Sequence, residues 1–277
     1  MKSNLIILIS LFSFQLFAQD LKVDKDVQLI DLDGLFKPFE GSFVLLDLQT
    51  DKKIVYNDSI ATERYSPCST FKITNSLISL EAGVANDETY TIEYDSLKVP
   101  PKPWWYTTEP MKHWIQDHSM KTAIKYSVVW YYQELARRIG VKDMTRLLNQ
   151  IDYGNNDISS GIDNFWLCGS LQVSALEQVD FIKKLYNTEL SGFSKQSQTT
   201  VKKIMLYESA DKYKLYGKTG GGDCWDNKVI GWYVGFVETK SGTYVFAMNM
   251  FVESFKDLGD KRIDLTKRVL KELKIIE

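Results

Sequence analysis

Strand-forming segments lie towards both ends of this chain of 277 residues, and a long stretch with helical patterning separates them. Near the N-terminus, residues 42–48 (SFVLLDL) and 53–57 (KIVYN) flank the polar turn QTDK, which is typical of a β-hairpin. Three further strand-like segments follow late in the chain, at residues 213–219, 228–238 and 243–252. Because strands satisfy their backbone hydrogen bonds by pairing, we expect one antiparallel sheet built from both ends of the chain.

The middle of the chain is predicted to form a helical lobe inserted into the path of this sheet. Apolar residues recur at helical spacing at residues 69–81, 127–139, 141–151 and 174–186, and again from about residue 260. We therefore predict an α+β fold with a sheet lobe of about 19–68 and 205–277, flanked by terminal helices. The helical lobe is predicted at about 69–204, and the boundary between two such lobes is a natural place for a ligand cleft.

The first 18 residues have the pattern of a secretory signal peptide. Lys2 precedes an apolar run from Leu5 to Phe17, and the small residue Ala18 follows. The run is shorter than the roughly 20 residues that a membrane-spanning helix needs, and a buried N-terminal helix is the alternative interpretation. We expect cleavage after residue 18 to leave residues 19–277 as an exported, periplasmic protein with no membrane attachment.

Charge and cysteine content argue against several classes of function. The net charge is −2 with both signs interspersed, whereas a nucleic-acid partner requires a clustered basic face. The chain has three cysteines, Cys68, Cys168 and Cys224, and such a small and odd number does not indicate a disulfide framework. Neither they nor the two histidines, His113 and His118, have metal-ligand spacing, so we predict no metal site.

A serine and a lysine one helical turn apart form the first candidate for catalysis. Ser69 and Lys72 belong to an S-T-F-K motif in an otherwise apolar segment, on one face of the predicted helix. Burial disfavours the charged ammonium, so a neutral amine there can take the serine proton, and free N–H groups at the helix start can serve an oxyanion. The spacing alone is weak, because Ser209 and Lys212 repeat it in a stretch that looks solvated.

A glycine-rich segment that begins Lys218-Thr219-Gly220 is the second candidate. Glycine on a strand lets a ligand lie close to the backbone, and Gly221 extends this property. The lysine supplies a positive charge and the threonine a hydroxyl for an anionic group. The alternative is a simple glycine-rich hairpin end, and a similar K-S-G triplet at 240–242 falls in a tight turn.

Two further short motifs lie in the helical middle. Ser127 and Val129 form an S-x-V motif at a helix start, where a serine is most simply an N-cap. Tyr153 opens a Y-G-N triplet that is most simply a turn. Neither indicates chemistry alone, but S-x-x-K, S-x-V, Y-G-N and K-T-G follow one another in that order along the chain.

These motifs and the sequence around them closely resemble the class D β-lactamases, which are serine enzymes with the penicillin-binding-protein fold. The likeness takes in PCSTFKITNSLISLEAGV, MKHWIQDHSMKTAIKYSVVWYYQELARRIG, FWLCGSLQVSALEQVDFIKKL and KTGGG with WYVGFVE, and covers nearly all of residues 19–277. The resemblance implies hydrolysis of the β-lactam amide of penicillin-type antibiotics through a serine acyl-enzyme. It implies a small-molecule substrate and no metal.

The resemblance also implies which residues act on the substrate bond. Ser69 matches the nucleophile, and Lys72 matches a lysine that the family carries as an N-carboxylated general base, so that carbon dioxide held as a carbamate is the one expected cofactor. Trp166 matches the tryptophan whose indole N–H holds that carbamate, and Val129 the apolar residue against it. Ser127 matches the serine that relays a proton to the leaving nitrogen.

The substrate-facing positions that the resemblance implies are Lys218, Thr219, Gly220, Gly221, Arg262 and Tyr153. Lys218 and Thr219 match strand residues that face the substrate carboxylate, and Lys218 also counts among the catalytic groups. The backbone N–H groups of Ser69 and Gly221 match the oxyanion hole. Arg262 lies where the family often has a carboxylate-binding arginine, which is the looser match.

Two alternatives stay open: a penicillin-binding transpeptidase or carboxypeptidase that β-lactams only trap, and a sensor domain that is acylated without turnover. We expect a sensor to be fused to membrane helices and a penicillin-binding enzyme to lack Trp166, and both expectations favour the β-lactamase. The segment from about 87 to 110 looks longer than is usual in the family, and glycines 221 and 222 suggest a flexible segment. Substrate preference, the role of Cys68 and the oligomeric state, monomer or homodimer, stay open.

Overall fold

The computed structural model describes residues 27–277, and the predicted signal peptide at residues 1–18 lies outside them. The strands are β1 (Val27–Leu29), β2 (Glu40–Asp47), β3 (Lys53–Tyr56), β4 (Thr91–Ile92), β5 (His118–Ser119), β6 (Leu206–Ser209), β7 (Tyr213–Trp225), β8 (Lys228–Thr239) and β9 (Thr243–Val252). The α-helices are α1 (Asp33–Phe36), α2 (Asp58–Thr62), α3 (Phe71–Glu81), α4 (Met120–Lys125), α5 (Val129–Ile151), α6 (Ala175–Asn187), α7 (Lys195–Ile204), α8 (Phe255–Leu258) and α9 (Lys261–Glu272). Three short 3-10 turns are η1 (Cys68–Thr70), η2 (Pro103–Tyr106) and η3 (Met111–His113).

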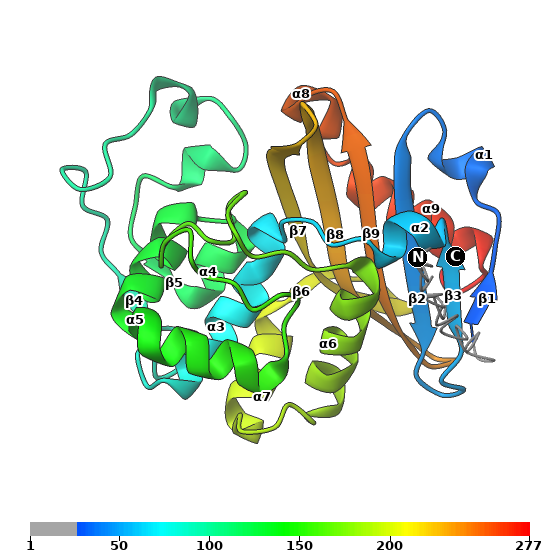
Figure 1. Cartoon of the computed structure of the whole chain (residues 1–277), viewed down its shortest axis with the longest axis horizontal. Helices are drawn as coiled ribbons and strands as arrows, with labels where there is room; N and C mark the ends of the chain where they lie inside the picture. The colour runs from blue at the N-terminus through cyan, green and yellow to red at the C-terminus, as the bar shows by residue number, and fades with distance from the viewer. Residues whose placement is uncertain (1–26) are drawn as a thin grey trace, which may run out of the picture.

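One seven-stranded sheet combines strands from the N-terminal and C-terminal parts of the described chain, in the order β1-β3-β2-β9-β8-β7-β6. The N-terminal hairpin strand β2 pairs antiparallel with β9, so that Phe43 lies opposite Met248. The other pairings are antiparallel as well, except that β1 runs parallel to β3. The sheet and the helices beside it, visible in Figure 1, confirm the predicted α+β fold.

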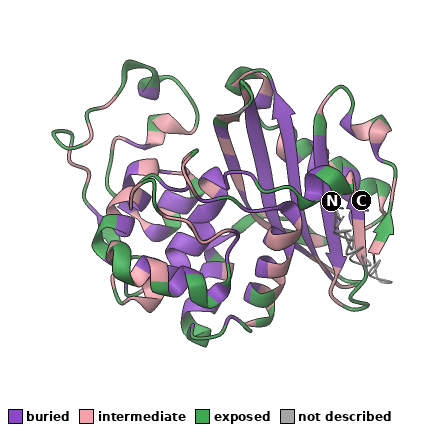
Figure 2. Cartoon of the chain, viewed as in Figure 1, coloured by how far each residue is buried: buried purple, intermediate pink, exposed green. Residues whose placement is uncertain are grey.

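Both faces of the sheet are covered, as the purple central strands in Figure 2 show. Successive side chains on a strand point to opposite faces. In β2, Val44 and Leu46 join the hydrophobic core on the side of the helical lobe, whereas Phe43 and Leu45 join the core under α9. Strands buried on both faces need apolar residues at every position, and this explains why β2 does not alternate polar and apolar residues.

The helical lobe is built around α3, which packs against α5 and α7. Gly140 has φ 77° and ψ 162° within α5, so the helix is kinked where the sequence predicted a break between two helices. Helix α6 begins with the capping box of Ser174 and Glu177. It packs against β9, β2 and β8, although the predicted boundary at residue 204 assigned it to the helical lobe.

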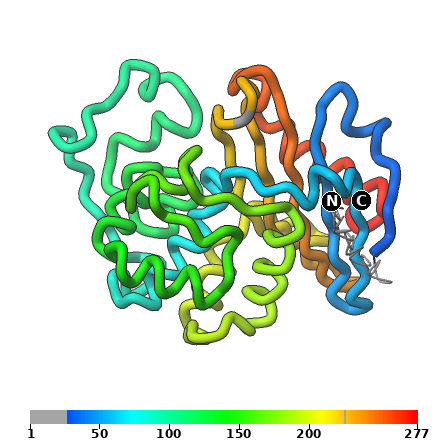
Figure 3. The backbone as a smooth tube through the Cα atoms, in the orientation of Figure 1, coloured from blue at the N-terminus to red at the C-terminus, as the bar shows by residue number. Residues whose placement is uncertain are grey.

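The backbone trace in Figure 3 makes a long excursion between β4 and β5, at the upper left of the view. This segment has few regular elements, but Trp105 and Trp114 are buried within it, with ring centroids 5.0 Å apart. The first and last described segments lie on the opposite side of the molecule, where α1 packs against α9. Within residues 27–277, no helix combines the length and the apolar composition that a bilayer crossing requires.

Strand β7 extends beyond the predicted end at residue 219, as far as residue 225. Gly221 pairs with Gly231 and Gly222 pairs with Ile230 of β8. The expected flexible segment after the K-T-G motif is therefore wrong, because pairing with a buried central strand fixes these glycines in the sheet.

Candidate active site

Ser69 lies in the turn η1, which leads directly into α3. Lys72 stands in the first turn of that helix, and its Nζ atom lies 2.6 Å from Ser69 Oγ. The lysine side chain has no exposed surface, and this burial lowers the pKa of Lys72 to about 7. A neutral amine is therefore accessible near neutral pH, and a neutral amine can accept the serine proton.

Trp166 is the second buried group with an unusual environment. Its indole N–H is enclosed and has no hydrogen-bond partner within the described part of the chain. The ring stacks on Phe71, with centroids 5.4 Å apart, and so lies against the residue that precedes Lys72. Burying a donor without an acceptor is unfavourable, and an acceptor carried on Lys72 would satisfy it. The residues present therefore fit an N-carboxylated lysine, with Val129 as a partly buried apolar neighbour of the same core.

Ser127 is held in a backbone conformation that non-glycine residues seldom adopt. Its φ is 54°, and its N–H donates to Ile124 O at 3.3 Å in the connection between α4 and α5. The N-cap position of α5 is Val128, so the alternative interpretation of Ser127 as a helix cap is wrong. A left-handed conformation costs roughly 1–2 kcal/mol, and such strain is found preferentially where a side chain must be held in place for function.

In the described part of the molecule, the outer edge of β7 has no strand partner beside η1, the nucleophile turn that carries Ser69. Strand β6 pairs with β7 only up to Tyr216, and from Lys218 onward this edge has no strand partner among residues 27–277. The turn η1 packs along it instead. A Cβ atom on Gly220 would lie 2.8 Å from Pro67 O, which is too close for any real contact. Glycine at position 220 therefore permits β7 to approach the turn that carries Ser69.

Two cations converge on this edge. Lys218 is buried and donates from Nζ to Thr219 O at 2.9 Å, while Arg262 donates from Nη1 to Gly220 O at 3.1 Å. Burial and the nearby charges of Lys72 and Arg262 hold the pKa of Lys218 well below its usual value. Burial also lowers the pKa of Arg262 to about 10, and its Nε–H has no partner within the described structure. Clustered cations with an unused donor favour an anionic ligand.

Tyr153 has a different place from the substrate-facing one that the resemblance implied. It is buried, and its hydroxyl hydrogen-bonds to Gln178 Oε1 at 3.1 Å. Gln178 in turn donates from Nε2 to Thr70 Oγ1 at 2.9 Å. Tyr153 therefore supports the nucleophile turn from behind, through a glutamine, and we correct its role from substrate contact to positioning.

Gln178 was not among the residues that the sequence suggested. It lies on the buried stripe of α6 with Phe181, Ile182 and Leu185, at the spacing i, i+3, i+4 and i+7. An amide on such a stripe must find buried partners, since an unpaired buried amide is costly. A polar residue on an otherwise apolar helix face is therefore the sequence feature that could have identified Gln178.

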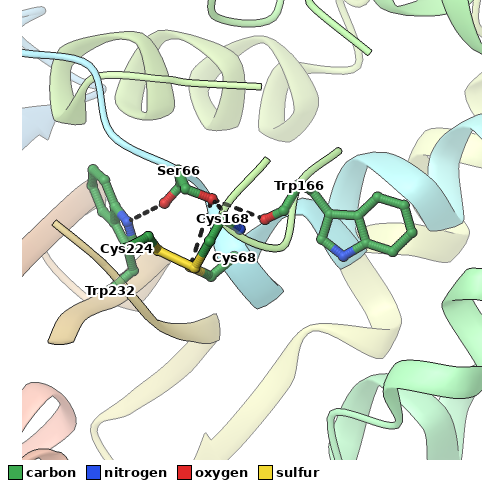
Figure 4. Close-up of a disulfide and its surroundings, with 6 residues drawn as sticks. All are labelled: Ser66, Cys68, Trp166, Cys168, Cys224 and Trp232. Carbon is green, nitrogen blue, oxygen red and sulfur yellow. Dashed lines mark hydrogen bonds between the residues drawn. A yellow bond between two sulfur atoms is a disulfide. The ribbon is translucent and has the colours of Figure 1, made fainter. Parts of the chain in front are cut away.

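Ser66 ties the nucleophile turn to two tryptophans. Its Oγ donates to Trp166 O at 3.0 Å, accepts from Cys168 N at 3.1 Å, and its carbonyl accepts from Trp232 Nε1 at 3.0 Å (Figure 4). These bonds fix the loop that carries Trp166 relative to Ser69 through the residues between them. The arrangement is visible only in three dimensions, because the partners lie 100 and 166 residues from Ser66.

The cysteines correct an expectation. Cys168 and Cys224 form a disulfide with a Cα–Cα distance of 5.2 Å, although three scattered cysteines suggested no such bond. They are 56 residues apart in sequence, and the fold brings the loop after Trp166 to the end of β7. Cys68 is a free, buried thiol, and burial raises its pKa to about 11.

The two histidines serve local packing. His118 is buried and hydrogen-bonds to His113 O at 2.8 Å and Thr122 Oγ1 at 3.0 Å. His113 stacks on Tyr126 with ring centroids 4.1 Å apart. These contacts connect the two histidines to nearby residues of the same segment, and none of them reaches Ser69.

The model of the penicillin binding protein transpeptidase domain matches residues 41–271. Together with the Ser69–Lys72 pair and the cationic edge of β7, this match shows that the chain belongs to the family of penicillin binding protein transpeptidase domains. Within that class, the chain belongs to the class D β-lactamase family. It is 41% identical over 251 residues to the probable β-lactamase YbxI of Bacillus subtilis, over 91% of this chain and 87% of the relative. It is also 41% identical over 237 residues to β-lactamase OXA-48 of Klebsiella pneumoniae, over 86% of this chain and 84% of the relative.

Solved structures agree with this assignment. The class D β-lactamase from Bacillus subtilis has a TM-score of 0.79 and 39% identity, covering 90% of this chain and 97% of that chain. The class D β-lactamase from Sebaldella termitidis has a TM-score of 0.82 and 33% identity, covering 91% and 98%. A methicillin resistance mecR1 protein from Staphylococcus aureus is 34% identical over 249 residues, which is 90% of this chain but only 40% of mecR1.

Proposed function

We propose that this protein hydrolyses the amide bond of β-lactam antibiotics through an acyl-enzyme on Ser69. The observation that carries the proposal is the contact between Lys72 Nζ and Ser69 Oγ at 2.6 Å, in surroundings that lower the lysine pKa to about 7. The class D β-lactamase relatives support the substrate class.

The acylation step uses residues that lie around the nucleophile turn. Ser69 Oγ attacks the lactam carbonyl carbon while its proton passes to the basic group at Lys72. The N–H groups of Ser69 and Gly221 stabilise the oxyanion. The ring C–N bond then breaks, and the Ser127 hydroxyl relays a proton to the leaving nitrogen: it gives up its own proton and takes back the one that Ser69 released to the basic group at Lys72.

Lys218, Thr219 and Arg262 are assigned to the carboxylate of the substrate. Among the described residues, the Arg262 Nε–H has no hydrogen-bond partner, and the buried Lys218 Nζ hydrogen-bonds only to oxygen atoms of Thr219. A carboxylate placed there gains charge-assisted hydrogen bonds and relieves the repulsion between the two cations. Binding energy from this end of the substrate orients the lactam carbonyl against Ser69.

We further propose that Lys72 carries carbon dioxide as a carbamate, held by Trp166 and Val129. This group supplies a carboxylate base at neutral pH, for acylation and for activating the water that releases the product. The lowered pKa of Lys72 supports the proposal, since only the neutral amine has a free electron pair to react. The unpaired indole N–H of Trp166 supports it as well, because a carboxylate is an acceptor only.

Turnover of a chromogenic β-lactam by the purified protein tests the proposed function. We expect many turnovers per chain, and a loss of at least about 1,000-fold in Ser69→Ala, as removal of a nucleophile causes. Ser209→Ala is the matched control, since it alters the exposed second S-x-x-K motif and should keep full activity. A single burst, followed by a stable acyl adduct in the intact mass, would instead indicate a domain that is acylated without turnover.

We also propose that residues 1–18 direct export to the periplasm. The intact mass of protein recovered from a periplasmic extract should correspond to a chain that begins at Gln19. Recovery of the uncleaved chain from the cytoplasmic fraction alone would contradict this assignment.

A further inference from the structure

Three cysteines from distant parts of the chain meet beside the nucleophile turn. Cys68 precedes Ser69, Cys168 follows Trp166, and Cys224 lies at the end of β7. Their Sγ atoms all lie within 4.8 Å of one another. Figure 4 shows the three cysteine side chains next to each other. Cys168 and Cys224 are joined as a disulfide, and Cys68 Sγ lies 3.9 Å from Cys224 Sγ. The third thiol has no part in the mechanism proposed above.

The backbone of β7 makes room for this cluster at Gly222. A Cβ atom built there would lie 2.6 Å from Cys68 Sγ and 2.7 Å from each of the other two sulfur atoms. The three sulfurs therefore surround one point on the same side of the strand. Any residue other than glycine would place a carbon atom among them.

We propose that, when the Cys168–Cys224 disulfide is reduced, the three cysteines bind one thiophilic d10 cation such as Zn²⁺. Tetrahedral zinc–thiolate bonds of about 2.3 Å require sulfur atoms roughly 3.8 Å apart. The separation of Cys68 and Cys224 is 3.9 Å already, and breaking the S–S bond allows Cys168 to move to a similar distance. Three thiolates leave the fourth position to a water molecule.

Metal loading needs one external reductant in addition to the cation. An external thiol or phosphine supplies the two electrons that cleave the S–S bond, and two protons complete the thiols. The cation then displaces the three thiol protons to the solvent, because thiolates are the metal ligands. No other group of the chain is oxidised or reduced.

Charge and access both suit such a site. A divalent ion with three thiolates has a net charge of −1, and the positive charge of Arg262 already acts on Cys68. Cys168 is exposed, and a cavity of about 140 Å³ lined by Cys168, Cys224 and Ser66 opens beside the cluster. Reductant and metal ion can therefore enter from this cavity.

The bound metal ion would connect more segments of the chain than the disulfide does. The disulfide joins the Trp166 loop to β7 and leaves the nucleophile turn untethered by a covalent bond. A bound ion joins all three segments through Cys68, Cys168 and Cys224. Sequence analysis did not predict this site, because the cysteines have no metal-ligand spacing along the chain.

Metal titration of the reduced full chain tests the proposal. The protein is treated with a phosphine, desalted without oxygen, and titrated with Zn²⁺ against a chromophoric chelator and with Cd²⁺ by thiolate charge-transfer absorption. We expect one ion per reduced chain and none per oxidised chain. Each of Cys68→Ser, Cys168→Ser and Cys224→Ser should lose more than the roughly tenfold in affinity that removal of an outer partner costs.

The controls separate this site from adventitious binding. His113→Gln removes a metal-binding side chain elsewhere and should leave the stoichiometry and affinity unchanged. Circular dichroism verifies that the reduced chain and the variants are folded. The proposal is overturned if the reduced wild type unfolds or binds no ion, or if Cys68→Ser binds as tightly as the wild type. It is equally overturned if the ion is lost in His113→Gln.

Discussion

The side chain of Lys72 reaches back one turn along α3 to Ser69, so that its Nζ lies 2.6 Å from the serine Oγ, with no lysine surface exposed to solvent. Its hydrogen-bond partner is a hydroxyl rather than a carboxylate, so this contact does not offset the cost of burying a positive charge. The buried Lys72 amine therefore lowers the free energy of unfolding, and the same burial makes it a reactive base.

The first prediction is that Lys72→Met stabilises the fold and abolishes turnover. Methionine fills a similar volume without a charge, so the free energy of unfolding should rise by about 1–2 kcal/mol. Urea denaturation in bicarbonate-free buffer measures the change. A lower free energy of unfolding in the methionine variant would show that the buried amine is not a source of strain.

The difference in free energy of unfolding between Lys72→Met and the wild type should depend on pH. The pKa of Lys72 is 10.5 in the unfolded chain and about 7 in the folded one, so the unfolded state binds more protons between these values. Wild-type stability should therefore rise with pH across this interval relative to Lys72→Met. The advantage of the variant should be greatest below about pH 7 and disappear towards pH 10.5.

The second prediction concerns bicarbonate. Above about pH 7 the Lys72 amine is neutral, and added bicarbonate should restore turnover to protein from which carbon dioxide has been removed. Well below pH 7 the ammonium form dominates and bicarbonate should have no effect. Steady-state rates with and without bicarbonate across this range measure the response, and rates independent of bicarbonate at every pH would contradict the carbamate.

The third prediction is that Trp166→Phe weakens carbamate retention. The variant keeps the ring that stacks on Phe71 but removes the unpaired N–H donor. Because a hydrogen bond to a charged acceptor contributes about 1.5–3 kcal/mol, the bicarbonate concentration for half-maximal activity should rise at least about tenfold. Trp104→Phe, at an exposed tryptophan, is the matched control and should behave as wild type.

The fourth prediction is that Arg262→Gln raises KM for a carboxylate-bearing β-lactam about tenfold or more with little change in kcat. The guanidinium is assigned to a part of the substrate that does not react, so its loss affects binding in the ground and transition states alike. Arg268→Gln changes an exposed arginine on the same helix and should alter neither constant. An equal fall in kcat with unchanged KM would assign Arg262 to the chemical step instead.

The fifth prediction is that Gly220→Ala separates β7 from the nucleophile turn. The added methyl group meets Pro67 O at 2.8 Å, and such overpacking costs about 1–3 kcal/mol. Both the free energy of unfolding and kcat/KM should fall. Gly34→Ala is the control, since nothing lies within 4 Å of its added carbon, and replacement of a helical glycine should stabilise by about 0.5–1 kcal/mol. Unaltered kcat/KM in Gly220→Ala would refute the close-approach argument.

Short sequence patterns predicted several helix starts, breaks and turns, because these features depend on residues that lie close together in the chain. The capping box at Ser174 and Glu177, the break at Gly140 and the hairpin around residues 49–52 all follow from side chains close in sequence, and the structure has each of them. The S-T-F-K spacing likewise predicted the proximity of Lys72 to Ser69, since one helical turn separates them.

Groups that depend on long-range contacts were misjudged or missed. The role of Tyr153 changed because its hydroxyl partner, Gln178, comes from a helix 25 residues further on. The disulfide depends on the meeting of a loop with the end of β7, and no spacing rule contains that distance. The alternative interpretation of Ser127 as a helix cap was wrong because sequence does not record a positive φ at a serine.

The pairing of β2 with β9 sets when this protein can begin to fold as a whole. Glu40 lies opposite Phe251, so the middle of the sheet forms only after almost the whole chain has been synthesised. Helical segments with local contacts can form early, whereas such distant pairing is slow and leaves strands exposed in the meantime. A nascent chain therefore remains loosely structured until its last strands emerge, and enzymatic activity should appear only with the complete polypeptide.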